Sequence, residues 1–213
     1  VSARPFLFVQ STSEVGGAET VLCNAMAASE SLRRRSAVAL LQFGHGDLAE
    51  RLQRMDVPVI ALPRGRLRDP RWLLASIWRL NKVCREIRAD CLVANGAHPQ
   101  VVAGPAARLA RRRSVFLVNL IHEVPLRRNP LIDQAAFTVP CDLALANSKA
   151  CLSTLTSLIP RTRLGLLYPG TASRAVTMQQ AHEARRALGV ADDDVLFGVF
   201  GRLQRWKGQD VFV

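Results

Sequence analysis

Short apolar runs alternate with amphipathic stretches along most of the chain. A strand-length run that is apolar throughout predicts a strand buried on both faces, and apolar residues at three- and four-residue spacing predict a helix. The predicted strands are 6–10, 37–42, 57–62, 91–94, 115–121, 143–146 and 164–167. The predicted helices are 17–29, 47–55, 70–87, 99–110, 131–137 and 149–158. This alternation predicts an α/β fold, a Rossmann-like parallel sheet with helices on both faces.

The pattern changes after residue 167. Residues 168–177 are rich in Pro, Gly, Ser and Thr and lack periodicity, which is typical of a linker. A helix over 179–188 and an apolar strand over 195–200 are predicted beyond it. We therefore expect 1–167 to form one domain, and 168–213 to be a linker and the start of a second, truncated Rossmann-like domain.

The predicted strand 195–200 has no partner strand within the second domain. A complete domain of this class needs on the order of 100 residues, so this one cannot close a core of its own. Because unpaired strand edges tend to pair, we expect the strand to join the sheet of the first domain or to mediate self-association.

The composition indicates a folded protein: 49% of the 213 residues are hydrophobic and 22% are charged. Apolar runs stay below the roughly 18 residues that cross a bilayer, and the run over 5–10 is too short for a signal peptide, so a cytoplasmic protein is expected. The five cysteines form no C-x-x-C pair, which favours free thiols in a reducing compartment.

The formal net charge of +12 predicts attraction to an anionic partner. Nucleic acid, anionic lipid and a phosphorylated substrate all fit this charge. We do not expect nucleic acid, because no helix-turn-helix, zinc or aromatic stacking motif accompanies the basic residues, so a nucleic-acid-binding module is the less favoured alternative.

The predicted helix 70–87 is basic and amphipathic and contains two tryptophans. The favoured interpretation is that its apolar stripe packs on the sheet, as a crossover helix does. In the alternative, the helix contacts an anionic membrane, with Trp78 and the loop 64–68 as the segments that touch lipid.

A candidate site follows the apolar run 195–200, where Gly201-Arg202-Leu203 precedes Lys207-Gly208. A tight turn before a helix presents backbone N–H groups and the positive end of the helix dipole. Arg202 and Lys207 add two full charges at the same place. This combination suits a diphosphate.

These residues resemble the donor-diphosphate motif of retaining, nucleotide-sugar-dependent glycosyltransferases with the GT-B fold, the large bacterial family known as group 1 or family 4. Three further motifs of that family match in order along the chain: Gly16-Gly17-Ala18-Glu19, Ile121-His122 and Ala146-Asn147-Ser148. The resemblance implies transfer of a sugar from a nucleoside diphosphate sugar to a glycan, glycolipid or small-molecule acceptor, with retention. It also implies that no metal or other cofactor is needed.

The resemblance also assigns roles. Gly16 and Gly17 are expected near the donor diphosphate, and His122 is expected to contact the transferred sugar as the catalytic residue. Arg202 and Lys207 are expected to neutralise the departing diphosphate, in place of a metal ion.

Three more residues are candidates for the cleft, and each also has a structural explanation. Glu19 matches the glycine motif but can stabilise the start of its helix. His98 lies on the predicted ligand rim, although a loop hydrogen bond before Pro99 explains it as well. Asn147 precedes Ser148, a predicted helix N-cap.

In the resembling family, the second domain holds the nucleotide base and ribose. Since this part is missing from the sequence, we expect the 213 residues to bind donor weakly and to turn over little alone. A non-catalytic acceptor-binding half that acts with a partner chain is the alternative.

Overall fold

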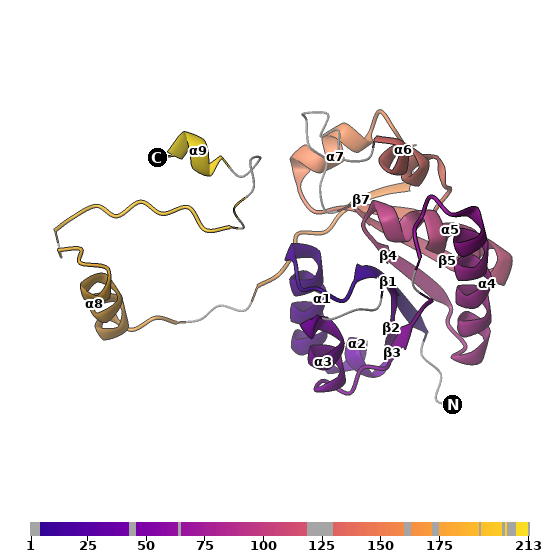
Figure 1. Cartoon of the computed structure of the whole chain (residues 1–213), viewed down its shortest axis with the longest axis horizontal. Coiled ribbons are helices and arrows are strands. Elements are labelled where there is room, and N and C mark those ends of the chain that lie inside the picture. Colours follow the sequence, from indigo (N-terminus) through magenta and orange to yellow (C-terminus); the bar gives the residue numbers. More distant parts are fainter. Residues whose placement is uncertain are drawn as a thin grey trace. The chain divides into compact units, whose positions relative to one another are not determined.

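The computed structural model describes residues 5–42, 46–63, 65–118, 130–159, 163–171, 175–191, 193–201, 203 and 208–212. The chain divides into two compact units, Val1–Ala172 and Ser173–Val213. The first unit contains the sheet, and the second contains the elements labelled α8 and α9 in Figure 1.

Among the described residues, seven parallel strands form one sheet in the order β3-β2-β1-β4-β5-β6-β7. They are β1 (Phe6–Thr12), β2 (Ser36–Gln42), β3 (Val59–Ala61), β4 (Cys91–Asn95), β5 (Arg113–Val118), β6 (Leu143–Ala146) and β7 (Leu164–Leu166). All seven were predicted, so the α/β fold class is confirmed. The strand β3 is shorter than expected and begins after Pro58, a residue without an N–H group.

Helices connect these strands. They are α1 (Gly17–Ala28), α2 (Glu30–Arg34), α3 (Asp47–Gln53), α4 (Pro70–Glu86), α5 (Ala97–Ala110), α6 (Pro130–Thr138) and α7 (Lys149–Leu155). The short helix α2 was not predicted. It forms because Ser29 is extended, which ends α1, while its side-chain oxygen accepts a hydrogen bond from the Leu32 amide at 3.2 Å.

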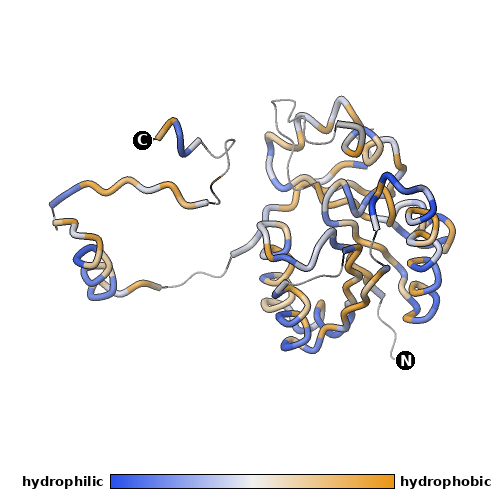
Figure 2. Tube along the Cα trace, viewed as in Figure 1, coloured by the Kyte–Doolittle hydropathy of each residue, from blue (hydrophilic) through white to orange (hydrophobic). Residues whose placement is uncertain are grey.

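The helices cover the two faces of the sheet separately. Leu7 and Val9 of β1 pack with α4 and α5, whereas Phe8, between them, packs with α1 and α3. Figure 1 shows α4 and α5 together on one side of the strands, and Figure 2 shows apolar residues concentrated along β1, β2 and β4. Toward the β7 edge, Phe116 and Ala146 pack with α6 and α7.

The strand order reverses at β1. The chain adds β2 and β3 on one side of β1 and then crosses to add β4 on the other side. In an open parallel sheet, such a reversal separates the loops that leave the two neighbouring strands and opens a crevice at their carboxyl ends. The fold therefore directs attention to the loops after β1 and β4.

The second unit consists of α8 (Met178–Ala187), α9 (Gln209–Phe212) and the segments that join them. Thr177 and Gln180 cap α8 reciprocally: the Thr177 hydroxyl accepts from the Gln180 amide at 3.2 Å, and the Gln180 side chain accepts from the Thr177 amide at 3.0 Å. None of the described residues of this unit is buried.

The predicted strand 195–200 is wrong for this structure. These residues form no strand, and Phe197 and Phe200 are 75% and 98% exposed. An apolar run becomes a strand only when a neighbour accepts and donates its ladder hydrogen bonds, and the described residues of this unit supply no neighbour.

The cysteines are free, as expected. Four are buried and Cys23 is half-buried. Burial raises the pKa of Cys84 to about 12 and that of Cys91 to about 11. A buried thiol with such a pKa stays protonated, which indicates packing rather than chemistry.

In the part of the chain that the structure describes, no helix has the length and apolarity to span a membrane.

Candidate functional site

The loop between β1 and α1 forms the centre of the candidate site. Ser13 is 2% exposed, and its carbonyl oxygen accepts a hydrogen bond from the Leu48 amide of α3 at 3.1 Å. Asn95, at the end of β4, donates from Nδ2 to the carbonyl oxygen of Ala18 at 3.1 Å. The loop and the first turn of α1 are therefore held from both neighbouring elements.

Glu19 stabilises the start of α1. Its side chain is 8% exposed, and Oε2 accepts a hydrogen bond from the Gly16 amide at 3.0 Å. This contact satisfies an N–H group that has no acceptor inside the helix. A Cβ atom on Gly16 would lie 2.9 Å from the same oxygen, so Gly16 has a packing reason to be glycine.

Packing does not require a glycine at position 17. A Cβ atom there would meet nothing within 4 Å, and its φ is not in the left-handed region. The residue is exposed at the first position of α1. A glycine that neither packing nor backbone conformation requires leaves space beside N–H groups at a helix N-terminus, where an anion binds favourably.

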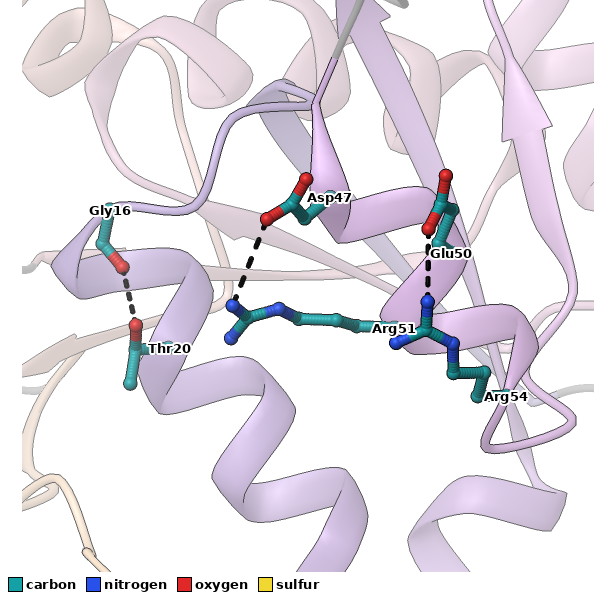
Figure 3. Close-up of polar contacts among 6 residues, drawn as sticks. All are labelled: Gly16, Thr20, Asp47, Glu50, Arg51 and Arg54. Atoms are coloured by element: carbon teal, nitrogen blue, oxygen red, sulfur yellow. Dashed lines mark hydrogen bonds and ion pairs between the residues drawn. The ribbon is translucent and has the colours of Figure 1, made fainter.

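Figure 3 shows polar side chains of α1 and of α3 near the end of this loop at Gly16. The Thr20 hydroxyl donates to the carbonyl oxygen of Gly16 at 2.7 Å. Arg51 extends from α3 toward α1, and its guanidinium lies 3.9 Å from the Asp47 carboxylate. About half of the Arg51 side chain is exposed. Arg51 is thus a described cation between α3 and α1 that the motifs did not single out.

A buried amide lies beneath the loop. Gln10 of β1 is fully buried, and its side-chain nitrogen and oxygen have no hydrogen-bond partner among the described residues. The strands pair Val9 with Ala94, so Gln10 lies beside Asn95 on the same face of the sheet. Sequence reasoning missed both residues. The sequence feature that could have identified them is a polar side chain at the carboxyl end of an otherwise apolar strand.

His98 lies in the first turn of α5, which begins two residues earlier than predicted. Its Nε2 atom is buried and has no hydrogen-bond partner among the described residues. Burial lowers the pKa of His98, because the charged ring is disfavoured there. The ring is therefore neutral near neutral pH.

The Ser148 side-chain oxygen caps α7 by accepting from the Cys151 amide at 3.1 Å, as predicted. The neighbouring Asn147 donates its backbone N–H to the Val118 carbonyl at 3.3 Å. Asn147 also lines a largely apolar pocket of about 500 Å³ within the first unit. The other lining residues are Val21, Asn24, Ala25, Ala27, Ala28, Leu117, Leu145 and the segment 167–171.

The structure thus separates the predicted site residues into groups. Gly16, Gly17 and Glu19 lie together at the switch point, His98 begins the helix after β4, and Asn147 lines the pocket. His122, Arg202 and Lys207 lie outside the described residues. Within the described ranges, no cluster of three or more His, Cys, Asp or Glu side chains is suited to hold a metal ion.

The parallel sheet, its reversal at β1 and the glycine loop define a Rossmann-like domain of the GT-B type. Residues 15–172 match the model of Glycosyltransferase Family 4, and the chain belongs to that family. The family inferred from the sequence motifs is thereby confirmed, whereas retention of configuration stays a prediction. None of the curated proteins compared with the chain matches it significantly.

Solved structures share the fold. HepE from Anabaena, in complex with UDP and glucose, is 24% identical, with a TM-score of 0.73 over 98% of this chain and 56% of HepE. A glycosyltransferase from Rickettsia africae is 13% identical, with a TM-score of 0.69 over 99% of this chain and 56% of the other. A UDP-GlcNAc 2-epimerase from Neisseria meningitidis, bound to UDP-GlcNAc, is 13% identical, with a TM-score of 0.54 over 76% and 45%.

The chain spans about half the length of these relatives. Identities this low show the fold alone. The epimerase illustrates the limit, since a similar fold carries a different reaction on a nucleotide sugar.

Proposed function

We propose that the protein transfers a sugar from a nucleoside diphosphate sugar to an acceptor, with retention of anomeric configuration. The observation that carries the proposal is the family match over 15–172 together with the glycine loop at the switch point of the sheet. Because HepE was solved with UDP and glucose, a UDP-sugar is the first donor to test.

In this reaction, the bond between the anomeric carbon and the diphosphate oxygen breaks, and a bond to an acceptor hydroxyl oxygen forms. The acceptor proton is released, and negative charge accumulates on the diphosphate. The open space at Gly17 and the N–H groups at the start of α1 suit an anionic group of this kind.

Arg202 and Lys207, which belong to the second unit, are the other two residues that we propose to bind the diphosphate. Two cationic side chains stabilise the charge that develops as the diphosphate departs, so the reaction proceeds without a divalent metal ion. His122 orients and hydrogen-bonds the transferred sugar. His98, neutral because of its lowered pKa, is the second-choice histidine for this contact.

A donor screen on the whole protein tests this function. The protein is incubated with UDP-, GDP-, ADP- and dTDP-sugars, and release of nucleoside diphosphate is measured with and without a chelator. We expect release from one donor class, unaffected by the chelator, and loss of at least about 100-fold in Arg202→Ala or Lys207→Ala. Conversion of the donor to an epimer without release of diphosphate would instead favour epimerase chemistry.

We also propose a cytoplasmic location at the inner face of a membrane, and self-association through residues 195–200. The exposed apolar side chains of this segment support the second proposal, because a solvent-facing apolar run gains free energy when it is covered. Light scattering measures the mass directly. A strict monomer at all concentrations would refute self-association.

A further inference from the structure

Helix α4 carries two different apolar surfaces. Trp72, Ile77 and Leu80 are buried and pack in the core on the sheet, as the sequence predicted for this helix. Leu74 and Trp78 are 67% and 63% exposed. The two side chains are one helical turn apart, so they form a single apolar patch on the solvent side.

The two tryptophans of α4 differ in burial. Trp72 is 6% exposed, and its indole N–H donates to the carbonyl oxygen of Pro63 at 2.7 Å. This tryptophan serves the fold. Trp78 points away from the core and has no equivalent burial, although an exposed indole is costly in water.

Cationic side chains share the face of Trp78. Arg71, Lys82 and Arg85 are exposed, and their positions seven residues before and four and seven after Trp78 place them along the same stripe of the helix. The acidic side chain of α4, Glu86, lies 3.8 Å from Lys82 Nζ and 3.9 Å from Arg79. Both pairs are long and partly exposed, so they neutralise the stripe only weakly.

The elements around α4 extend the positive charge. Arg66 precedes the helix and Arg88 follows it, and both are exposed. Helices α4 and α5 pack against each other and lead into neighbouring parallel strands (Figure 1). The C-terminal ends of α4 and α5 therefore lie at the same edge of the sheet, where Arg108 of α5 and Arg111, which follows α5, are also exposed.

We infer that the outer face of α4, which we call the α4 stripe (Arg71, Leu74, Trp78, Lys82 and Arg85), docks the protein on an anionic membrane surface. An indole with a neighbouring leucine partitions into the headgroup region, and the flanking cations attract anionic headgroups. The buried stripe keeps α4 on the sheet, so contact is made by the folded domain rather than by a detached helix. The inference does not depend on sugar transfer.

The direction of α4 determines which part of the first unit faces the membrane. The helix starts after the carboxyl end of β3, at the edge of the sheet where the glycine loop follows β1, and runs toward the opposite edge on the face of the sheet away from α1. Arg71 and Leu74 therefore belong to the half of the stripe nearer the glycine loop. A protein docked through this stripe therefore meets the membrane with the face of the sheet opposite to α1.

Vesicle co-sedimentation of the 213-residue chain tests the inference. We expect binding to phosphatidylcholine vesicles that contain about one third phosphatidylglycerol, weaker binding at high salt, and little binding to pure phosphatidylcholine. The double variant Leu74→Ser with Trp78→Ser, and separately Lys82→Gln with Arg85→Gln, should each lower the partition coefficient by about tenfold or more.

Matched controls separate the stripe from the overall charge. Arg34→Gln with Arg54→Gln removes two exposed cations from other helices, and Leu158→Ser removes a side chain that is 50% exposed elsewhere. We expect both controls to bind like the unmodified chain. Equal loss of binding in the charge control and the stripe variants would overturn the inference, as would failure of the unmodified chain to bind anionic vesicles.

Tryptophan fluorescence gives a second readout. The chain has three tryptophans, so the Trp78 signal is the difference between the unmodified chain and Trp78→Phe. Anionic vesicles should shift this difference spectrum to shorter wavelength, because the indole leaves water. An unshifted spectrum in a vesicle-bound protein would show that another surface makes the contact.

Discussion

Asn95 at the end of β4 donates a hydrogen bond to the carbonyl oxygen of Ala18 in the first turn of α1, at 3.1 Å. The two residues are 77 positions apart in the sequence, and their hydrogen bond joins β4 to the helix that follows β1. The glycine loop is therefore positioned by the neighbouring strand as well as by its own.

Removing this link should weaken the fold. Asn95 is 6% exposed, so Asn95→Ala removes buried hydrogen bonds and should lower the free energy of unfolding by about 1–3 kcal/mol. Urea denaturation measures the change. Asn24→Ala, at a half-buried asparagine of α1, is the control and should change stability by less than about 0.5 kcal/mol.

The two glycines of the loop should respond differently to alanine. Gly16→Ala places a Cβ atom 2.9 Å from Glu19 Oε2, which pushes the carboxylate away from the Gly16 amide, so we expect a loss of about 1 kcal/mol. Gly17→Ala meets nothing within 4 Å and should leave stability unchanged or raise it by up to about 1 kcal/mol.

Gly17→Ala also tests the proposed donor site. If an anionic group approaches the start of α1, the added methyl group should lower kcat/KM of the whole protein by about tenfold, although the fold is intact. Unchanged kinetics together with unchanged stability would mean that the space beside Gly17 is not used.

The buried thiols predict loss of stability in alkali. The pKa of Cys84 is raised to about 12 and that of Cys91 to about 11, in both cases chiefly by burial. The folded state therefore holds these protons more tightly than the unfolded chain. This contribution is fully present below the ordinary thiol pKa and is lost as the pH rises through and above it.

Urea denaturation at about pH 8 and about pH 10 measures this effect, and the free energy of unfolding should be lower at the higher pH. Cys84→Ala with Cys91→Ala should flatten the dependence, although the double variant starts from lower stability. A dependence of the same slope in the variant would assign the effect to other groups.

The 213-residue chain should bind nucleotide sugars weakly. None of the described residues of the second unit is buried, so the described part of this unit has no packed core that would hold it in one geometry. Ordering it on binding costs free energy that reduces affinity. Isothermal titration calorimetry with UDP-glucose should give a dissociation constant of about 1 mM or weaker, and micromolar affinity would contradict this expectation.

The sequence by itself determined the order of elements in the first unit. Strands buried on both faces are short and apolar throughout, and helices on one face are amphipathic, so each type has its own pattern. The family followed from motifs at the predicted rim, because a tight approach to a ligand limits which residue types fit there. Ser148 was predicted as a cap since capping depends on neighbours a few positions away.

Tertiary structure alone decided the rest. Asn95 donates to Ala18, 77 positions away in the sequence, and Gln10 is buried beside Asn95. Residues 195–200 have the pattern of a strand yet form none, because strand formation depends on a partner. Periodicity likewise identified the apolar side of α4, but only packing against the sheet showed that Trp72 is buried and Trp78 exposed. Local pattern records what each segment can form, whereas burial and pairing depend on residues far away in the chain.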